Sequence, residues 1–520
     1  AFREVAEEVS GRDLRALFGQ WLHGTHLYDY AVGRVIVSGA DGQRGGGAGG
    51  SYLSRVEVVR RAPGVFPVTV VVRSRTDSGV VRIEGSAERE WVTLATRERP
   101  LEVEVDPEIR SHDWNVLNNR KRRGILGFRR APRTMVYLDR FFSRPIRRDG
   151  FSLGMVPTIW YNDEGGVTLG ARLRSDYLGR FEQNTGWLTL DTRRLAETDR
   201  PGIGMFLRVQ NPVRFLRPRV SQSFEAFSVE GRRGLAAAAE RDLTRHRTFG
   251  ARRAVGIEAR WLVTTDTRFL DPASWDAGGT VEASAWSRLA GRWGAWSVAG
   301  RISLGGGIEY RNRGEGLSTR DRYDAQAYFR GHGELRARRG LGASSGLSVR
   351  IFAGGLFSPD AALKQRQFFA AGADPYEQFG NPLLRSRGAV LARDGVHYLM
   401  PGGGGVRGLN PAVSAARMVA VGGELDRSVF TRNQGTWLRG IRVAAFTDWA
   451  IGDGDLPADA RGAAIIGDAG VGLRLAHRIG DTFFTTRLDF PLYVSRPDLA
   501  VNAPERAIGA RWVLSFTNER

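Results

Sequence analysis

The chain has 520 residues and a formal net charge of +20, and it contains no cysteine. The absence of cysteine excludes disulfides, zinc–thiolate sites and cysteine nucleophiles. The 67 glycines and 26 phenylalanines favour strands, tight turns and aromatic girdles over a helical protein. Lysine occurs only at Lys121 and Lys364, so almost all positive charge is arginine. The use of arginine in place of lysine along the whole chain indicates a bias in genomic base composition. We therefore expect no nucleic-acid partner.

Residues 1–27 are predicted to be helical. One helix is expected over Phe2–Val9 and a second from Ser10 to Leu22, with Ser10 as its N-cap. No run of about 18 or more apolar residues is present, so no transmembrane helix is expected. Because both helices carry an apolar face that needs a partner, we expect an upstream domain in the same polypeptide.

Residues 28–120 change to a period of two, which is typical of strands. About six short strands separated by turn residues predict a small β-sandwich. Residues 121–132 contain most of the basic run Arg120–Arg123 and are expected to form a basic linker.

Parts of these first 120 residues resemble a known family. The segments Ser10–Leu14 and Phe18–Leu22 are similar to the "SGxDL…FxxWL" helix that ends the catalytic domain of membrane alanyl aminopeptidase-like zinc peptidases, the gluzincins. In that family a small β-sandwich follows. Val105–Pro107, Asp113–Asn115 and Asn118-Asn119 resemble the end of that sandwich in bacterial members.

The zinc-binding motif of that family is missing from this chain. The family holds zinc with a His-Glu-x-x-His helix, whereas none of the seven histidines here is followed by glutamate. We therefore predict no catalytic residue, no metal ligand and no cofactor in this chain. The resemblance implies that zinc would be bound by the upstream domain.

Residues 133–520 show strand, turn and strand again, with little else. This predicts a mainly β fold that ends in a transmembrane antiparallel β-barrel of about 16 strands, since closure leaves no edge unpaired in a bilayer. One of the weaker early candidates is expected to be wrong. The candidate strand centres lie near residues 135, 156, 170, 188, 205, 224, 237, 257, 284, 299, 331, 351, 420, 444, 470 and 487, with a further one near 513.

A second resemblance concerns the barrel. Gly402–Leu409 looks like the "VRGY/F" loop motif of the BamA-like and surface-antigen superfamily, although Leu409 replaces the aromatic residue. Phe446–Ala450 looks like the "FxDxG" strand motif, with Ala450 in place of glycine. The resemblance implies that the loop folds into the lumen and that Arg407 pairs with Asp448.

The residue types in this motif suit such an anchor. Glycines allow a loop to fold tightly, and the loop glycines are Gly404, Gly405 and Gly408. An arginine–carboxylate pair in a partly dry lumen is stronger than a surface pair. Glu424 and Asp489 are the alternative acid partners of the arginine.

The leading functional hypothesis is a non-catalytic segment in the bacterial outer membrane that anchors and presents an aminopeptidase-like zinc metallopeptidase ectodomain. Its expected partners are outer-membrane lipid, the upstream peptidase domain of the same polypeptide, and peptide or protein substrates. The first alternative is a BamA-like polypeptide transporter or insertase. The second alternative is a soluble all-β binding protein with a dry core.

Overall fold

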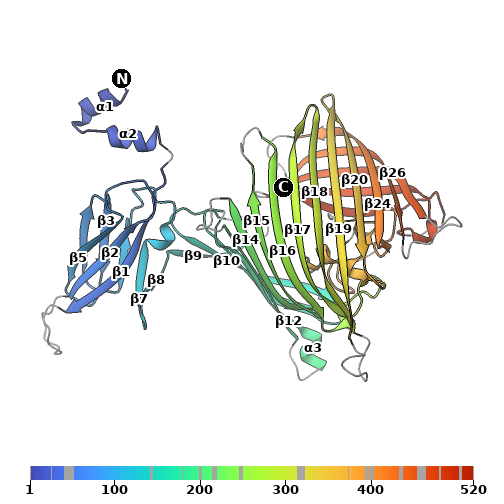
Figure 1. Cartoon of the computed structure of the whole chain (residues 1–520), viewed down its shortest axis with the longest axis horizontal. Coiled ribbons are helices and arrows are strands. Elements are labelled where there is room, and N and C mark those ends of the chain that lie inside the picture. The colour runs from blue at the N-terminus through green and yellow to red at the C-terminus, as the bar shows by residue number, and fades with distance from the viewer. Residues whose placement is uncertain are drawn as a thin grey trace. The chain divides into compact units, whose positions relative to one another are not determined.

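The computed structural model describes most of the chain, in sixteen stretches. It forms two compact units, which we call the sandwich unit (Ala1–Tyr137, Pro145–Leu153 and Ser175–Gly179) and the barrel unit (Leu138–Arg144, Gly154–Arg174 and Arg180–Arg520). Figure 1 shows the elements of each unit. The described residues are 2–24, 26–39, 52–140, 145–179, 181–197, 202–212, 219–244, 250–312, 323–372, 374–392, 396–397, 403–432, 437–453, 464–479, 482–502 and 506–518.

Two short helices begin the chain, α1 (Phe2–Ser10) and α2 (Arg15–Trp21). The predicted boundary between them is wrong. Ser10 ends α1, where its hydroxyl donates to the Ala6 carbonyl at 2.6 Å, so it is not the N-cap of the second helix. The backbone breaks at Gly11, whose φ of +64° is disfavoured for other residues.

The sandwich predicted after these helices is confirmed. One sheet has the order β1-β2-β5 and the other β4-β3-β6-β7-β8. Alternating valines of both sheets, with Val56, Val70 and Val103 fully buried, form the core between them. The strands are β1 Tyr30–Gly39, β2 Tyr52–Arg60, β3 Val68–Arg73, β4 Ser78–Ile83, β5 Arg89–Thr96, β6 Glu102–Val105, β7 Arg120–Gly124 and β8 Gly127–Arg130, with the 3-10 turn η1 at Val116–Asn118.

The segment 121–132, expected to be a linker, forms the β7–β8 hairpin instead. Its basic residues pair with β6, where Glu102 lies opposite Arg122 and Glu104 opposite Arg120. Cross-strand pairs of opposite charge stabilise a sheet. The basic run is therefore part of the sandwich.

Asp113 is a buried carboxyl group of the sandwich unit. Its oxygens accept the backbone N–H groups of Tyr30 and Asn115, both at 2.7 Å. Burial, together with the nearby charge of Asp29, raises the pKa of Asp113 to about 7. The two backbone hydrogen bonds offset only part of this effect.

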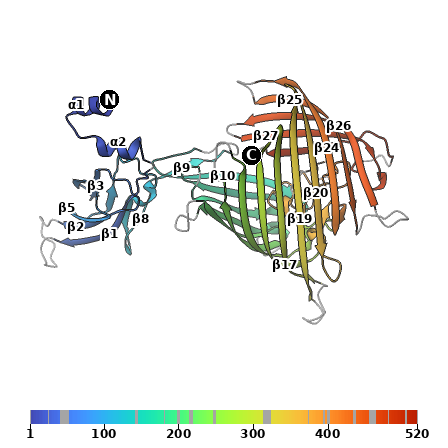
Figure 2. The same ribbon diagram turned by 45° about the horizontal axis from the view of Figure 1, so that its top comes forward.

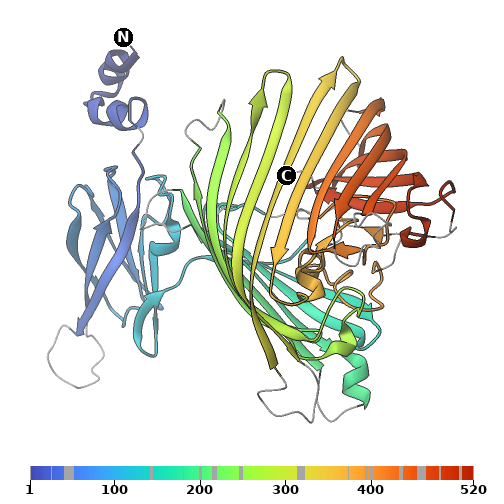
Figure 3. The same ribbon diagram turned by 45° about the vertical axis from the view of Figure 1, so that its right-hand side comes forward.

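The barrel predicted for the rest of the chain is confirmed as a closed sheet, in which successive strands from β11 to β28 pair antiparallel. Its main sheet has 17 strands, and every predicted strand centre falls within one of them, including the early candidates. Figures 2 and 3 show the succession of strands from β10 through β20 to β24–β27. The strands are β9 Thr134–Leu138, β10 Phe151–Asn162, β11 Gly166–Asp176, β12 Gln183–Asp191, β13 Gly202–Pro212, β14 Val220–Val229, β15 Arg232–Asp242, β16 Arg252–Thr264, β17 Gly278–Trp293, β18 Trp296–Asn312, β19 Tyr323–Leu341, β20 Ser345–Phe357, β24 Arg417–Thr431, β25 Leu438–Gly452, β26 Ala464–Ile479, β27 Thr482–Val494 and β28 Val513–Asn518.

Side chains alternate between the outside of the barrel and its lumen. Large apolar side chains on the outside are exposed, such as Ile257 (63%), Leu304 (52%) and Ile351 (43%). Their neighbours along the strands point inward and include many charged groups. This orientation, with the apolar face outward, is that of a barrel in lipid.

Short elements occupy the connections between the strands. The long connection between β20 and β24, residues 358–416, contains several of them and is called here the inserted segment. The short elements are α3 Thr192–Glu197, η2 Thr267–Phe269, η3 Lys364–Arg366, β21 Phe368–Phe369, α5 Pro375–Phe379, β22 Val396–His397, β23 Ser414–Ala415 and η4 Pro497–Leu499.

Candidate functional site

The inserted segment folds against the inner wall of the barrel. Its strands β21 and β23 pair with each other, and the backbone N–H of Val406 donates to the carbonyl of Ala370 at 2.8 Å. Phe368, Val406 and Leu409 are fully buried in one apolar cluster. That cluster also contains side chains of the wall, namely Phe352, Leu356, Met418, Ala420, Ala450, Ile466 and Val494.

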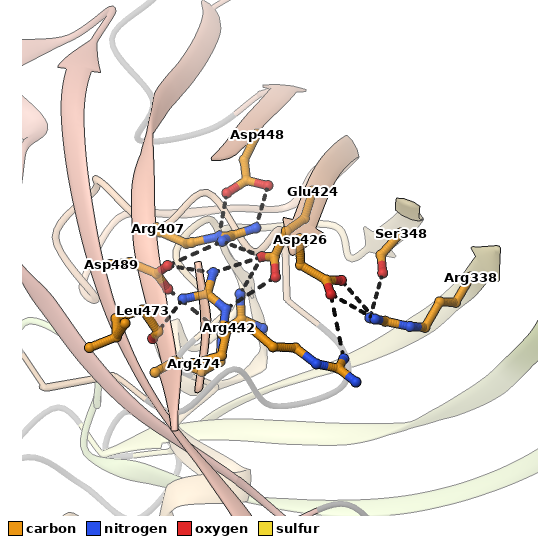
Figure 4. A network of polar contacts seen from close by, with 11 residues as sticks. Arg338, Ser348, Arg407, Glu424, Asp426, Arg442, Asp448, Leu473, Arg474 and Asp489 are labelled. Carbon is orange, nitrogen blue, oxygen red and sulfur yellow. Dashed lines mark hydrogen bonds and ion pairs between the residues drawn. The ribbon is translucent and has the colours of Figure 1, made fainter. Parts of the chain in front are cut away.

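Arg407 of the inserted segment contacts all three predicted acids at once. Its Nε lies 2.7 Å from Oδ2 of Asp448, and its Nη1 lies 2.8 Å from Oε2 of Glu424. Nη1 is also 3.4 Å from Oδ1 of Asp489. Figure 4 shows these ion pairs of Arg407. The guanidinium also lies over the ring of Phe446, 4.0 Å from its centroid, so both polar and aromatic groups hold it in place.

Two wall arginines share these acids. Arg474 lies 2.8 Å from Glu424 and 2.6 Å from Asp489, and Arg487 lies 2.7 Å from Glu424. Three arginines therefore face three carboxylates, and their charges balance. We call these six residues, Arg407, Glu424, Asp448, Arg474, Arg487 and Asp489, the anchor cluster.

The register of the wall explains why these side chains converge. Glu424 is on β24, Asp448 on β25 and Asp489 on β27, each at a lumen-facing position. Gly422 pairs with Asp448 across β24 and β25. A Cβ at Gly422 would lie 2.5 Å from Oδ1 of Asp448, so this glycine leaves room for the carboxylate.

At the three loop glycines, neighbouring atoms come too close to leave room for a side chain, and this matters more than the freedom of the glycine backbone. Of the three, Gly405 has a positive φ, +79°, and a Cβ there would lie 2.6 Å from Nη1 of Arg350. A Cβ at Gly404 would lie 2.7 Å from the Ala370 carbonyl oxygen, and one at Gly408 would lie 2.9 Å from Val494. A larger residue at any of them would displace the segment.

Asp468 on β26 was missed by the sequence analysis. Its fully buried carboxylate accepts the backbone N–H of Gly408, next to Arg407. It pairs with Asp448 in the register of β25 and β26. Asp468 lies two residues before Gly470 in an ordinary alternating strand. Nothing in that local sequence distinguishes it from other charged residues of the wall.

A second contact of the inserted segment was also missed. Arg385 forms a bidentate pair with Glu230 at the β14–β15 turn, with both N–O distances at 2.9 Å. Trp160 Nε1 donates to the same carboxylate at 2.7 Å. A third arginine of the segment, Arg366, pairs with Glu282 on β17. The segment is thus held by arginine at three separate places on the wall.

A cavity of about 730 Å³ lies beside the anchor cluster. Side chains and backbone of β17–β20 and β24–β27 line it, together with Gly372, Gly405 and Arg407 of the inserted segment. The volume falls in the range of sites that bind small molecules.

No catalytic or metal-binding arrangement stands out in the described part of the chain. Among the residues that the structure describes, no group of three or more His, Cys, Asp or Glu residues could hold a metal ion. Within the same residues, no helix is both long and apolar enough to cross a membrane.

The fold and the anchor cluster together define a transmembrane β-barrel of the outer-membrane type, with a segment of its own chain inserted in the lumen. The barrel spans a lipid bilayer, because its closed sheet leaves no backbone edge unpaired and its apolar side chains lie outside. The alternative of a soluble all-β protein is wrong, because the exposed Ile257, Leu304 and Ile351 would then face water.

No protein-family model and no curated protein matches the chain. Among solved structures, the chain is similar to BamA from Haemophilus ducreyi lacking POTRA domains 1–3, with 13% identity and a TM-score of 0.36 over 71% of this chain and 70% of that chain. It is also similar to CdiB from Escherichia coli, with 11% identity and a TM-score of 0.36 over 93% and 68% of the two chains. The third similar structure is CdiB from Acinetobacter baumannii, with 8% identity and a TM-score of 0.32 over 94% of this chain and 65% of that chain. None of these three matches supports the peptidase resemblance.

Proposed function

We propose that this barrel transports polypeptides or inserts them into the membrane, and that the inserted segment controls this activity. The observation that carries the proposal is the way the segment is held. Arg366, Arg385 and Arg407 attach it to the wall through ion pairs. In its described part, its backbone pairs with the barrel sheet through β22, where Val396 and His397 lie beside β28, and through Ala416, whose carbonyl accepts the Leu356 N–H. The wall strands β20 and β24 pair directly with each other. The segment can therefore leave the lumen without opening the sheet.

The anchor cluster suits such a reversible attachment. A buried ion pair gains little net free energy over an apolar contact of the same size, because desolvation offsets much of the attraction. Once water enters, the three arginines and three carboxylates are solvated and their mutual attraction falls. A polypeptide with charged side chains could thus replace the segment at moderate cost.

The last strand also differs from the rest of the wall. β28 pairs with β27 over six positions, from Asp489 to Phe484, whereas β18 and β19 pair over 17 positions. Fewer backbone hydrogen bonds hold this end of the sheet. An insertase that works beside its barrel would use such a strand.

A disulfide that locks the segment tests the proposal. Leu409 and Ala500 form an isolated antiparallel bridge, and cysteines at such positions have suitable geometry for a disulfide. The chain has no cysteine of its own, so Leu409→Cys/Ala500→Cys gives a clean background. The readout is the rate at which proteoliposomes carrying the chain fold an added, urea-unfolded outer-membrane barrel protein.

The expected result is acceleration by the reduced variant and by the wild type, and its loss on oxidation. Wild-type protein treated with the same oxidant is the control. If the locked variant works as fast as the reduced one, the segment does not control the activity. If no form accelerates folding above empty liposomes, the insertase form of the proposal is wrong, and passage of a polypeptide into the liposomes then decides the transporter form.

A second candidate function is anchoring and presentation of a zinc metallopeptidase domain of the same polypeptide. The observation that favours it is the apolar surface of the two helices. Phe2, Val9 and Leu22 are 78%, 84% and 65% exposed, and exposed apolar surface gathered on one short element marks an interaction site. Zinc would be bound by that other domain.

This candidate is tested on the polypeptide isolated from its own membranes with an antibody against the sandwich. About one zinc per chain and hydrolysis of aminoacyl amides, both lost with a chelator, are expected. Absence of zinc and of this activity from the isolated polypeptide would exclude it.

A further inference from the structure

The cavity beside the anchor cluster is lined by charged groups of mainly one sign. Its lining includes the arginines Arg336, Arg338, Arg350 and Arg442, in addition to those of the anchor cluster. Three acids line it, Glu424, Asp426 and Asp448, and two of them already belong to the anchor cluster. The part of the cavity beyond the cluster is therefore dominated by arginine.

The arginines reach into the cavity further than their acid partners. Arg338 and Arg442 have side chains 45% and 49% exposed, whereas their partner Asp426 is 3% exposed. Arg336 is 51% exposed and its partner Glu334 is 8% exposed. A ligand in the cavity therefore meets guanidinium groups first, with the carboxylates behind them.

Asp426 and Glu334 each form ion pairs with two arginines. Arg338 Nη2 lies 2.7 Å from Oδ2 of Asp426, and Arg442 Nη1 lies 3.5 Å from its Oδ1 (Figure 4). Arg336 and Arg350 both contact Oε1 of Glu334. One carboxylate cannot neutralise two guanidinium groups, so each set retains a positive charge in a partly dry lumen.

The outer face of the same strands does not share this character. Along β20, the residue that follows Arg350 is Ile351, an apolar residue that is 43% exposed on the outer face. A general excess of arginine in the chain would not by itself concentrate it on the lumen side of β19, β20 and β25. The positive lining is a property of the cavity.

We propose that this cavity is a binding site for a small oxyanion with two or more negative charges, such as a diphosphate or a dicarboxylate. Arg338 and Arg442 bind one charged group and Arg336 binds the second. Paired guanidinium groups suit phosphate and carboxylate oxygens, which accept two parallel hydrogen bonds. The site is separate from any polypeptide activity and does not depend on it.

The test is a titration of the full chain, in phosphatidylcholine nanodiscs, with inorganic pyrophosphate by calorimetry. We expect one saturable site per chain. Arg338→Gln/Arg442→Gln should weaken binding at least tenfold. The matched control is Arg339→Gln/Arg427→Gln, which removes two exposed arginines from the outer ends of β19 and β24 and should keep the affinity within twofold.

A second variant guards against loss of folding. Arg336→Gln leaves Asp426 fully paired, and we expect it to weaken pyrophosphate binding at least threefold. The faster migration of unboiled samples on a gel shows that each variant retains its barrel. Absence of saturable binding by the folded wild type, or an equal loss in the control variant, would overturn the proposal.

Negatively charged oxygens of the kind that these arginines would bind occur both in free oxyanions and in the phosphate groups of lipids. Repeating the titration in nanodiscs with one third phosphatidylglycerol separates these sources. If a lipid headgroup occupies the site, the apparent affinity of the wild type for pyrophosphate falls there. An unchanged affinity identifies a free oxyanion as the ligand.

Discussion

The sandwich and the barrel use the same alternating pattern with opposite orientation. In the sandwich, Val56, Val70 and Val103 are fully buried between two sheets, and charged residues that alternate with them, such as Arg55, are exposed. In the barrel, Ile257 and Ile351 are exposed on the outer face, and the charged residues lie inside. The local structure of the strands is alike in both regions. The difference comes from what each sheet packs against.

This difference shows that the surroundings of a sheet decide whether its apolar side chains point inward or outward. An open sheet buries its apolar face against a second sheet, as β1-β2-β5 does against β4-β3-β6-β7-β8. A closed sheet has no second sheet, so its apolar face meets lipid and its polar face encloses the lumen. We therefore expect the two regions to respond differently when a charged group is removed or added, with the largest loss of stability inside the barrel.

Removal of a charged group should cost most where it is buried inside the barrel. Arg407→Ala leaves the buried Asp448 without its main partner, which lies 2.7 Å away, and we expect a loss of about 3–5 kcal/mol in the free energy of unfolding. Urea unfolding in vesicles, with the gel shift of unboiled samples as readout, measures it. Arg339→Ala, at an exposed site, should change stability by less than about 0.5 kcal/mol. Equal effects would contradict the anchor.

A buried charge in the sandwich should act through pH. Because the folded pKa of Asp113 is about 7 and its ordinary value is 3.8, folding favours the protonated form. The contribution is fully present below pH 4 and is lost as pH rises to about 7, and it amounts to at most about 4 kcal/mol. Asp113→Asn should flatten this dependence and stabilise the sandwich at pH 8.

Hydrogen exchange of β1 in the full chain, corrected for the intrinsic rate, measures this effect between pH 5 and pH 8. Wild-type protection should fall over this interval and the variant's should not. Parallel pH dependence in the two proteins would show that Asp113 is not the responsible group.

A new charge on an exposed apolar position should distinguish lipid from water. Ile351→Arg places a charge at the middle of β20, and we expect a loss of about 2–4 kcal/mol in the free energy of unfolding in vesicles. Val80→Arg in the sandwich, at a residue 62% exposed, should change stability by less than about 0.5 kcal/mol. If Ile351→Arg is as mild as Val80→Arg, the outer face of β20 does not contact lipid.

The smallest expected effect concerns a glycine of the inserted segment. Gly405→Ala puts a side chain on a residue with φ of +79° and against Arg350, and we expect a loss of about 1–2 kcal/mol. Gly342→Ala is the matched control, because Gly342 has φ of +78° but no atom within 4 Å of the added Cβ. Urea unfolding of both variants separates backbone strain from the contact with Arg350, and equal losses would show that the contact adds nothing.

Several features of this protein followed from the sequence alone. The period of two located every strand of the main barrel sheet, because this pattern depends only on neighbouring residues. The resemblance of the glycine-rich loop, and of the second strand after it, to family motifs predicted that Arg407 pairs with Asp448, with Glu424 and Asp489 as alternative acids. The sequence could not show that Arg407 contacts all three acids, since that depends on the register of four strands.

Other features were decided by the tertiary structure. Arg385 and Glu230 are 155 positions apart in the chain and meet only because the inserted segment crosses the lumen. The basic run Arg120–Arg123 looked like a linker, because its pairing with Glu102 and Glu104 is not local. The arginines around Asp426 stood out only once β19, β24 and β25 were placed together. Local pattern determines a strand, whereas closure of the sheet determines which side chains share the lumen and which meet lipid.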